Sequence, residues 1–130
     1  MRAQGSGVII TISSIAAIEN YPCVTYKTSK AALVTLTQQL AIQNAEYGIR
    51  ANVILPGLMD TPMAVDNRAQ AGGQTREEVV AARNARVPLG NKIGDAWDVA
   101  QAALFPASDE ARFIPGVSRP VEGGMSCRLG

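Results

Sequence analysis

Three residues near the start of the chain could together move a proton. Tyr26 and Lys30 are four positions apart, which on a helix places a phenol and an ammonium on one face, one turn apart. Ser14 precedes them, and its hydroxyl could hold a carbonyl oxygen beside the phenol. A cation about 4 Å away favours a phenolate by about 4 kcal/mol at an effective dielectric constant of about 20. These residues therefore predict acid–base chemistry on an alcohol or a carbonyl compound.

A structural interpretation of the same residues stays open. A chain with three tyrosines can contain a Tyr-x-x-x-Lys pair by chance, and that pair could lie on a helix surface. The preceding sequence favours the chemical interpretation. The β-branched run from Gly7 to Ser13 predicts a strand buried on both faces of a parallel sheet. Ser13 and Ser14 then come at its carboxyl end, where open α/β sheets bind their ligands.

Strands and helices alternate along the rest of the chain, which predicts one domain with a parallel sheet and right-handed crossovers. A helix from Pro22 or Val24 to Ala45 carries Leu33, Leu36 and Leu40 on one face and ends before Gly48, a left-handed cap. The sequence also predicts strands at Ile49–Leu55 and Gly116–Val121 and a short helix near Pro62–Ala69. A further helix is predicted from Thr75 to about Arg86, where Glu78 completes a capping box with Thr75. The last predicted helix is Ala96–Ala107, capped by Asp95.

Composition excludes several classes of function. The 130 residues have a net charge of +1 and are 47% hydrophobic, values typical of a globular protein without a nucleic-acid-binding field. No apolar run approaches the roughly 20 residues that span a bilayer, and no signal-peptide pattern opens the chain. There is no histidine, which excludes a Ser-His-Asp triad and the commonest zinc sites. Cys23 and Cys127 have no metal-ligand spacing. We expect a cytoplasmic protein with reduced thiols, no metal, and no nucleic-acid or membrane partner.

The order of these motifs resembles the short-chain dehydrogenase/reductase family. The matching segments are Val8–Ser14, Tyr26–Ala32, Gly48–Gly57, Val87–Gly90, Asp98–Ala100, Ala107–Glu110 and Val121–Gly124. The resemblance implies an α/β, Rossmann-type, doubly wound parallel sheet of about three strands. It also implies reversible hydride transfer between NAD or NADP and a small alcohol or carbonyl substrate.

The resemblance assigns roles residue by residue. Tyr26 would be the acid/base, Lys30 would tune it and hold the nicotinamide ribose, and Ser14 would polarise the substrate oxygen, with Ser13 as the competing serine. Nicotinamide contacts would come from Pro56, Gly57, the backbone of Met59, and Thr61. The segment from Leu58 to Gly94 would shape the substrate pocket, and nothing in it names a ligand.

The sequence also departs from the family pattern. The family begins with a strand and a Gly-x-x-x-Gly-x-Gly turn that are not found here, so residues 1–130 resemble only its carboxyl-terminal portion, without the amino-terminal dinucleotide-binding strands. We therefore expect an exposed edge at Val8–Ile12 and weak or no activity of this chain alone. The alternative is a non-catalytic fragment that pairs with itself or with a full-length subunit. Either protein would be a homo-oligomer formed through the Lys30–Ala45 helix. Pro106, inside a predicted helix, would cost about 3 kcal/mol unless the helix has ended.

Overall fold

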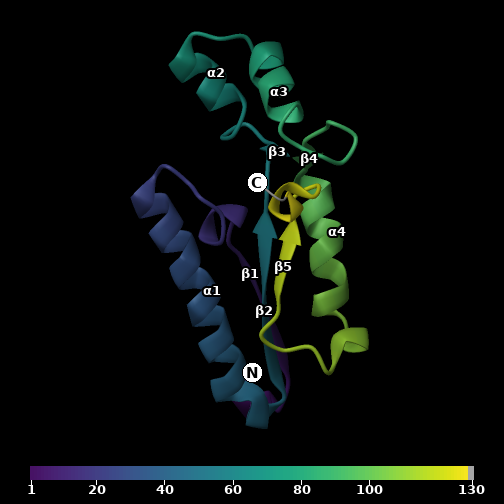
Figure 1. Ribbon diagram of the computed structural model, residues 1–130. Helices are drawn as coiled ribbons and strands as arrows, with labels where there is room; N and C mark the ends of the chain where they lie inside the picture. Colours follow the sequence, from purple (N-terminus) through teal and green to yellow (C-terminus); the bar gives the residue numbers. More distant parts are fainter. Residues whose placement is uncertain (129–130) are drawn as a thin grey trace.

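The structure, a computed structural model, describes residues 1–128. Figure 1 shows the arrangement of its strands and helices. The strands are β1 (Gly7–Ile12), β2 (Ile49–Pro56), β3 (Met59–Asp60), β4 (Gly94–Asp95) and β5 (Ser118–Val121), and the helices are α1 (Val24–Asn44), α2 (Asp66–Gly72), α3 (Arg76–Asn84) and α4 (Ala96–Ala107). Single 3₁₀ turns lie at Arg2–Gln4, Ile15–Ala17, Ala45–Tyr47, Asp109–Ala111 and Met125–Cys127.

The main sheet has the order β1-β2-β5 with both pairings parallel. Ile12 is opposite Ile54, and Pro56 is opposite Val121, so the carboxyl ends of all three strands lie at the same end of the sheet. The predicted α/β fold with about three parallel strands is confirmed. A second, two-stranded parallel pair joins β3 to β4. The sequence did not predict this pair, because strands of two residues carry no periodic signal.

The two long helices cover opposite faces of the sheet (Figure 1). Thr11, in register with Val53, contacts Thr37 of α1, whereas Arg50 and Asn52 reach the backbone at and beyond the end of α4. Side chains alternate between faces along a strand, so α1 and α4 lie on different sides. Both crossovers lead across the sheet in the same direction, from β1 to β2 and from β2 to β5. Because their helices lie on opposite faces, the two crossovers have opposite hands. The prediction of right-handed crossovers was wrong for one of them.

The inner face of α1 differs from the predicted leucine stripe. Its buried residues are Thr37, Ala41 and Asn44, while Leu36 is 53% exposed. These three side chains are short, and they let the helix axis approach the sheet closely. Thr37 and Asn44 satisfy their polar groups on the carbonyls of Leu33 and Leu40, as buried polar groups must.

The first strand is an edge strand rather than a strand buried on both faces. Residues Gly7–Thr11 are only partly buried and Ile12 is exposed, whereas β2 is buried at Ala51–Leu55. Only β2 has neighbours on both sides in the three-stranded sheet. The predicted strand burial was therefore wrong for β1, and the expected exposed edge at Val8–Ile12 is confirmed.

A second apolar cluster lies beneath α2 and α3. It is formed by Val65, Ala69, Val79, Val87 and Ile93. Thr75 and Glu78 form the predicted capping box of α3, and Asp95 and Asp98 form another at the start of α4. Helix α2 begins four residues later than the helix predicted near Pro62–Ala69.

The proline in α4 lies inside the helix, within its last turn, and is buried. Its carbonyl accepts a hydrogen bond from Nη1 of Arg50 at 2.7 Å, while Nη2 of the same guanidinium donates to Ser108. The helix ends at Ala107, so the missing N–H of Pro106 interrupts only its final turn. The long side chain from β2 thus stabilises the carbonyls at the end of this helix.

Candidate active site

The two candidate serines have different surroundings at the end of β1. Ser13 is buried, and its hydroxyl donates to the carbonyl of Lys30 at 2.7 Å. Ser14 is partly exposed and caps the following 3₁₀ turn, with its Oγ accepting from the N–H of Ala16 at 3.2 Å. The hydroxyl proton of Ser13 is committed to the backbone, whereas Ser14 uses only an acceptor position. Ser14 therefore retains a donor for a ligand.

Tyr26 and Lys30 lie in the first two turns of α1, both partly buried. Nζ of Lys30 is 5.6 Å from the centroid of the Tyr26 ring, the distance of a cation–π contact. On the preceding loop, the ring of Tyr21 packs against that of Tyr26, with centroids 5.4 Å apart and planes tilted by 42°. The phenol thus has a cation beside it and a second phenol next to it. Tyr21 was not among the predicted site residues.

The loop before α1 is fixed by a second lysine. Nζ of Lys27 donates to the carbonyl of Ala16 at 3.2 Å and to the carbonyl of Glu19. These bonds tie the Ile15–Ala17 turn to the helix that carries Tyr26. Together with the Ser13–Lys30 hydrogen bond, they hold the serine-bearing and tyrosine-bearing segments against one another.

The residues predicted to contact nicotinamide follow the end of β2. Pro56 is the last residue of that strand, and Gly57 donates its N–H to the carbonyl of Val121 at 2.9 Å. Oγ1 of Thr61 accepts from the N–H of Ala64 at 3.3 Å, which leaves its hydroxyl proton free for a ligand. The carbonyl of Met59 already accepts from Arg83 at 3.2 Å. Gly57 and Thr61 thus follow the carboxyl end of β2. They lie at the same end of the sheet as Ser14, which follows the carboxyl end of β1.

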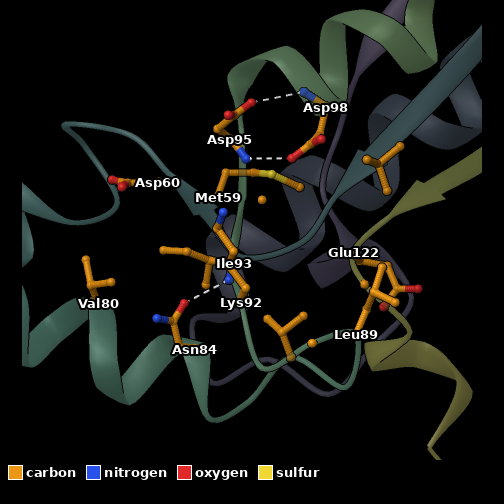
Figure 2. Close-up of a pocket in the computed structure, with 15 residues that line it drawn as sticks. Met59, Asp60, Val80, Asn84, Leu89, Lys92, Ile93, Asp95, Asp98 and Glu122 are labelled. Atoms are coloured by element: carbon orange, nitrogen blue, oxygen red, sulfur yellow. Dashed lines mark hydrogen bonds between the residues drawn. The ribbon is translucent and has the colours of Figure 1, made fainter.

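A cavity among the described residues lies elsewhere and is shown in Figure 2. Its volume is about 850 Å³. Of the predicted site residues only Met59 lines it. The labelled lining residues come from β3, α3, the loop between α3 and β4, the β4–α4 junction and the end of β5. Hydrogen bonds within its wall join Asn84 to Ile93 and Asp95 to Asp98. The cavity lies within the segment predicted to shape a substrate pocket, but neither Tyr26 nor Ser14 lines it.

Arg83 of α3 is a buried charged residue that was not among the predicted site residues. It is only 8% exposed, and its Nε has no hydrogen-bond partner among the described residues. Burial lowers the pKa of Arg83, and the charges of Arg68 and Arg86 lower it further, opposed by Tyr21 and Asp60. A signal existed in the sequence, because Arg83 falls between Val79 and Val87 at the four-residue spacing of a buried helix face.

Comparison with known proteins defines the class of this fold and site. The family model described as enoyl-(acyl carrier protein) reductase matches residues 1–126. A relative from Sphingobium indicum, 2,5-dichloro-2,5-cyclohexadiene-1,4-diol dehydrogenase LinX, is 36% identical over 126 residues, which cover 95% of this chain and 46% of the relative. The chain belongs to the short-chain dehydrogenase/reductase family.

Solved structures agree with this assignment. A short-chain dehydrogenase/reductase from Burkholderia xenovorans superposes with a TM-score of 0.88 at 39% identity, covering all of this chain (100%) and 49% of its own length. ElxO, solved with NADP bound, superposes with a TM-score of 0.85 at 27% identity over 98% of this chain and 50% of its own. The chain spans about half the length of the curated relatives it matches. No helix in residues 1–128 is both long and apolar enough to cross a membrane.

Proposed function

We propose that residues 1–130 form the carboxyl-terminal part of an NAD(P)-dependent oxidoreductase that interconverts an alcohol and a carbonyl compound. The observation that carries this proposal is the position of Lys30 beside the Tyr26 ring, 5.6 Å from its centroid, on a helix bonded to the strand that ends at the serines. A phenol next to a cation is suited to exchange a proton with a substrate oxygen. The family assignment and the NADP-bound neighbour support the choice of cofactor.

In this mechanism Ser14, Tyr26 and Lys30 have different roles. The hydroxyl of Ser14 donates to the substrate oxygen and holds it near Tyr26. The phenol of Tyr26 gives a proton to that oxygen when a carbonyl is reduced and removes it when an alcohol is oxidised. Lys30 stabilises the negative charge that develops on the phenolic oxygen.

The residues after β2 fit the nicotinamide half of the cofactor. A bound nicotinamide would supply or accept the hydride. Thr61 retains a hydroxyl proton, so it could bind the nicotinamide together with Pro56 and the backbone of Gly57. Met59 would contribute its backbone, although its carbonyl already accepts from Arg83. Lys30 would also bind the ribose.

A transplanted segment tests the proposal. Residues 1–130 would replace the matching half of the Burkholderia xenovorans protein, and turnover of secondary alcohols with NAD and NADP would be followed by nicotinamide absorbance. We expect measurable turnover in the hybrid and a loss of about a hundredfold or more on Tyr26→Phe. A hybrid that folds and binds cofactor but keeps its rate in Tyr26→Phe would refute the role of Tyr26. For residues 1–130 alone we expect no measurable turnover.

An interaction function is the second candidate. It is supported by the outer edge of β1, which pairs with no strand among the described residues, and by exposed apolar side chains on α1, with Leu36 53% and Ile42 71% exposed. An unpaired strand edge favours pairing with another chain. Sedimentation equilibrium of the wild type and of Leu36→Glu tests association through the Lys30–Ala45 helix. A monomeric wild type would remove self-association, and the absence of a complex when a full-length subunit is added would remove the rest of this candidate.

A further inference from the structure

The lysine next to the candidate catalytic tyrosine binds the main chain instead of an acid. Lys27 follows Tyr26 in α1 and is partly buried, and it forms no ion pair with the residues that the structure describes. Its ammonium donates to two carbonyls of the preceding loop, that of Ala16 at 3.2 Å and that of Glu19. The charge of Lys27 therefore fixes the path of the backbone that leads from β1 to α1.

One peptide group connects Lys27 to Ser14. Its carbonyl, from Ala16, accepts from Nζ of Lys27, and its N–H, from Ala17, donates to the carbonyl of Ser14 at 3.0 Å. The N–H of Ala16 donates to Oγ of Ser14 at 3.2 Å. Both oxygen atoms of Ser14 are thus held by the turn that Lys27 binds. Hydrogen bonds in series polarise one another, so the ammonium on this peptide group strengthens the bond from its N–H to Ser14.

The second carbonyl lies near the other side of the site. Glu19, whose carbonyl accepts from Lys27, comes two residues before Tyr21. The ring of Tyr21 packs on that of Tyr26, with centroids 5.4 Å apart. Figure 1 shows the turn after β1 beside α1 and the loop that runs from it to the start of the helix. A single side chain therefore holds the serine turn and this loop against the helix that carries the phenol.

Lys27 is the side-chain link between this turn and the helix. Among residues 1–128, no other side-chain hydrogen bond joins residues 14–22 to α1. The bond from Ser13 to Lys30 holds the end of β1, but it precedes the turn and does not orient Ser14. The position of the Ser14 hydroxyl relative to the helix therefore depends on Lys27.

We propose that Lys27 is a positioning residue, which sets the Ser14 hydroxyl at the distance from the Tyr26 phenol that the reaction needs. This inference rests on the proposed function and adds to it a residue that acts through Ser14. Both groups must reach one substrate oxygen, and a misplacement of about 1 Å can cost about a hundredfold in rate. Without the ammonium, the turn that orients Ser14 loses its side-chain hydrogen bonds to α1.

A double-mutant cycle in the hybrid enzyme tests the proposal. Lys27→Met keeps most of the apolar stem and removes both hydrogen bonds, so we expect kcat to fall about tenfold or more with an unchanged Kd for NADP. In the Ser14→Ala background the same change should cost about threefold or less, because the group that Lys27 positions is already absent. Lys27→Arg should restore part of the rate, since a guanidinium can donate to both carbonyls. Additive losses in the cycle would overturn the proposal.

Thr37→Val is the control for a general loss of stability. It removes a hydrogen bond between the same helix and β1, two turns after Lys30. We expect this variant to have a lower urea midpoint and an unchanged kcat at temperatures where it is folded. If kcat fell as far in Thr37→Val as in Lys27→Met, the effect of Lys27 would be one of stability and the proposal would be wrong.

Hydrogen exchange gives a readout that does not depend on turnover. Lys27→Met should raise the exchange rates of the Ala16 and Ala17 amides in the hybrid about tenfold or more, as measured by NMR, because their turn is no longer tied to α1. Unchanged rates would overturn the proposal whatever the activity. An additive cycle in a hybrid that Tyr26→Phe inactivates would refute the role of Lys27 alone, whereas full turnover in Tyr26→Phe would refute the proposed function.

Discussion

The buried hydroxyl of Ser13 donates to the carbonyl of Lys30 at 2.7 Å, and this bond joins the end of β1 to the second turn of α1. Lys30 is inside α1, so its carbonyl also accepts the intrahelical hydrogen bond from the N–H four residues on, and Ser13→Ala would remove only the second bond. We expect a loss of about 0.5 to 1.5 kcal/mol in the free energy of unfolding, measured by urea denaturation.

The neighbouring serine is the matched control for this change. Ser14→Ala removes the cap of a single 3₁₀ turn from a partly exposed position, so we expect a cost of about 1 kcal/mol or less. In the hybrid enzyme the order should reverse, with Ser14→Ala losing more activity than Ser13→Ala. If Ser13→Ala kept full stability and lost turnover, the two serines would exchange roles.

The contact between α1 and β1 depends on a threonine pair. Oγ1 of Thr37, in a side chain with no exposed surface, is 2.8 Å from Oγ1 of Thr11. Thr37→Val should cost about 1 to 2 kcal/mol, because it leaves the Thr11 hydroxyl without this partner. Adding Thr11→Val should recover part of the loss, since apolar groups of the same shape then replace both hydroxyls. A double-mutant cycle by chemical denaturation measures the coupling, and strictly additive losses would contradict the pairing.

The turn after β2 has no space for a side chain. A Cβ on Gly57 would lie 2.5 Å from the Cβ of Glu122, so Gly57→Ala must push the end of β5 away and weaken the hydrogen bond from Gly57 to Val121. We expect a lower unfolding midpoint, with a loss of about 1 to 3 kcal/mol.

Gly72→Ala is the control for the Gly57 substitution. It lies at the end of α2, where the nearest atoms to a new Cβ belong to the flexible side chain of Gln74, and alanine favours helix. This variant should be neutral or slightly stabilised in the same denaturation experiment. Equal losses at both positions would show that the Glu122 contact is not the cause of the Gly57 effect.

The sequence predicted those parts of the fold whose signals are local. Thr75 caps α3 through the capping box predicted with Glu78, and Asp95 caps α4 as predicted. Gly48 has the left-handed conformation expected after a helix, with φ of 67°. The buried face of α1 was not predictable from apolar spacing, because its centre is the polar Thr37, whose hydroxyl is satisfied by contacts.

The candidate site was likewise predictable only where its residues are close together in the sequence. Tyr26 and Lys30 are one turn apart, so helix geometry alone places them together. The packing of Tyr21 on Tyr26 depends on the path of a loop. The burial of Arg83 depends on a small core formed by segments distant in sequence. Neither relationship has a local sequence signal as strong as a capping box.

The thiol just before α1 should react at lower pH than an ordinary cysteine. A hydrogen bond with Thr25, whose Oγ1 is 3.5 Å from Sγ, and then the backbone N–H of Tyr26 lower the pKa of Cys23. A lowered pKa means that the thiolate, which is the reactive form, is already present at lower pH. We expect iodoacetamide to modify Cys23 before Cys127, as followed by mass spectrometry across a pH series. Thr25→Val should move the Cys23 profile to higher pH, and an unchanged profile would exclude Thr25 as the cause.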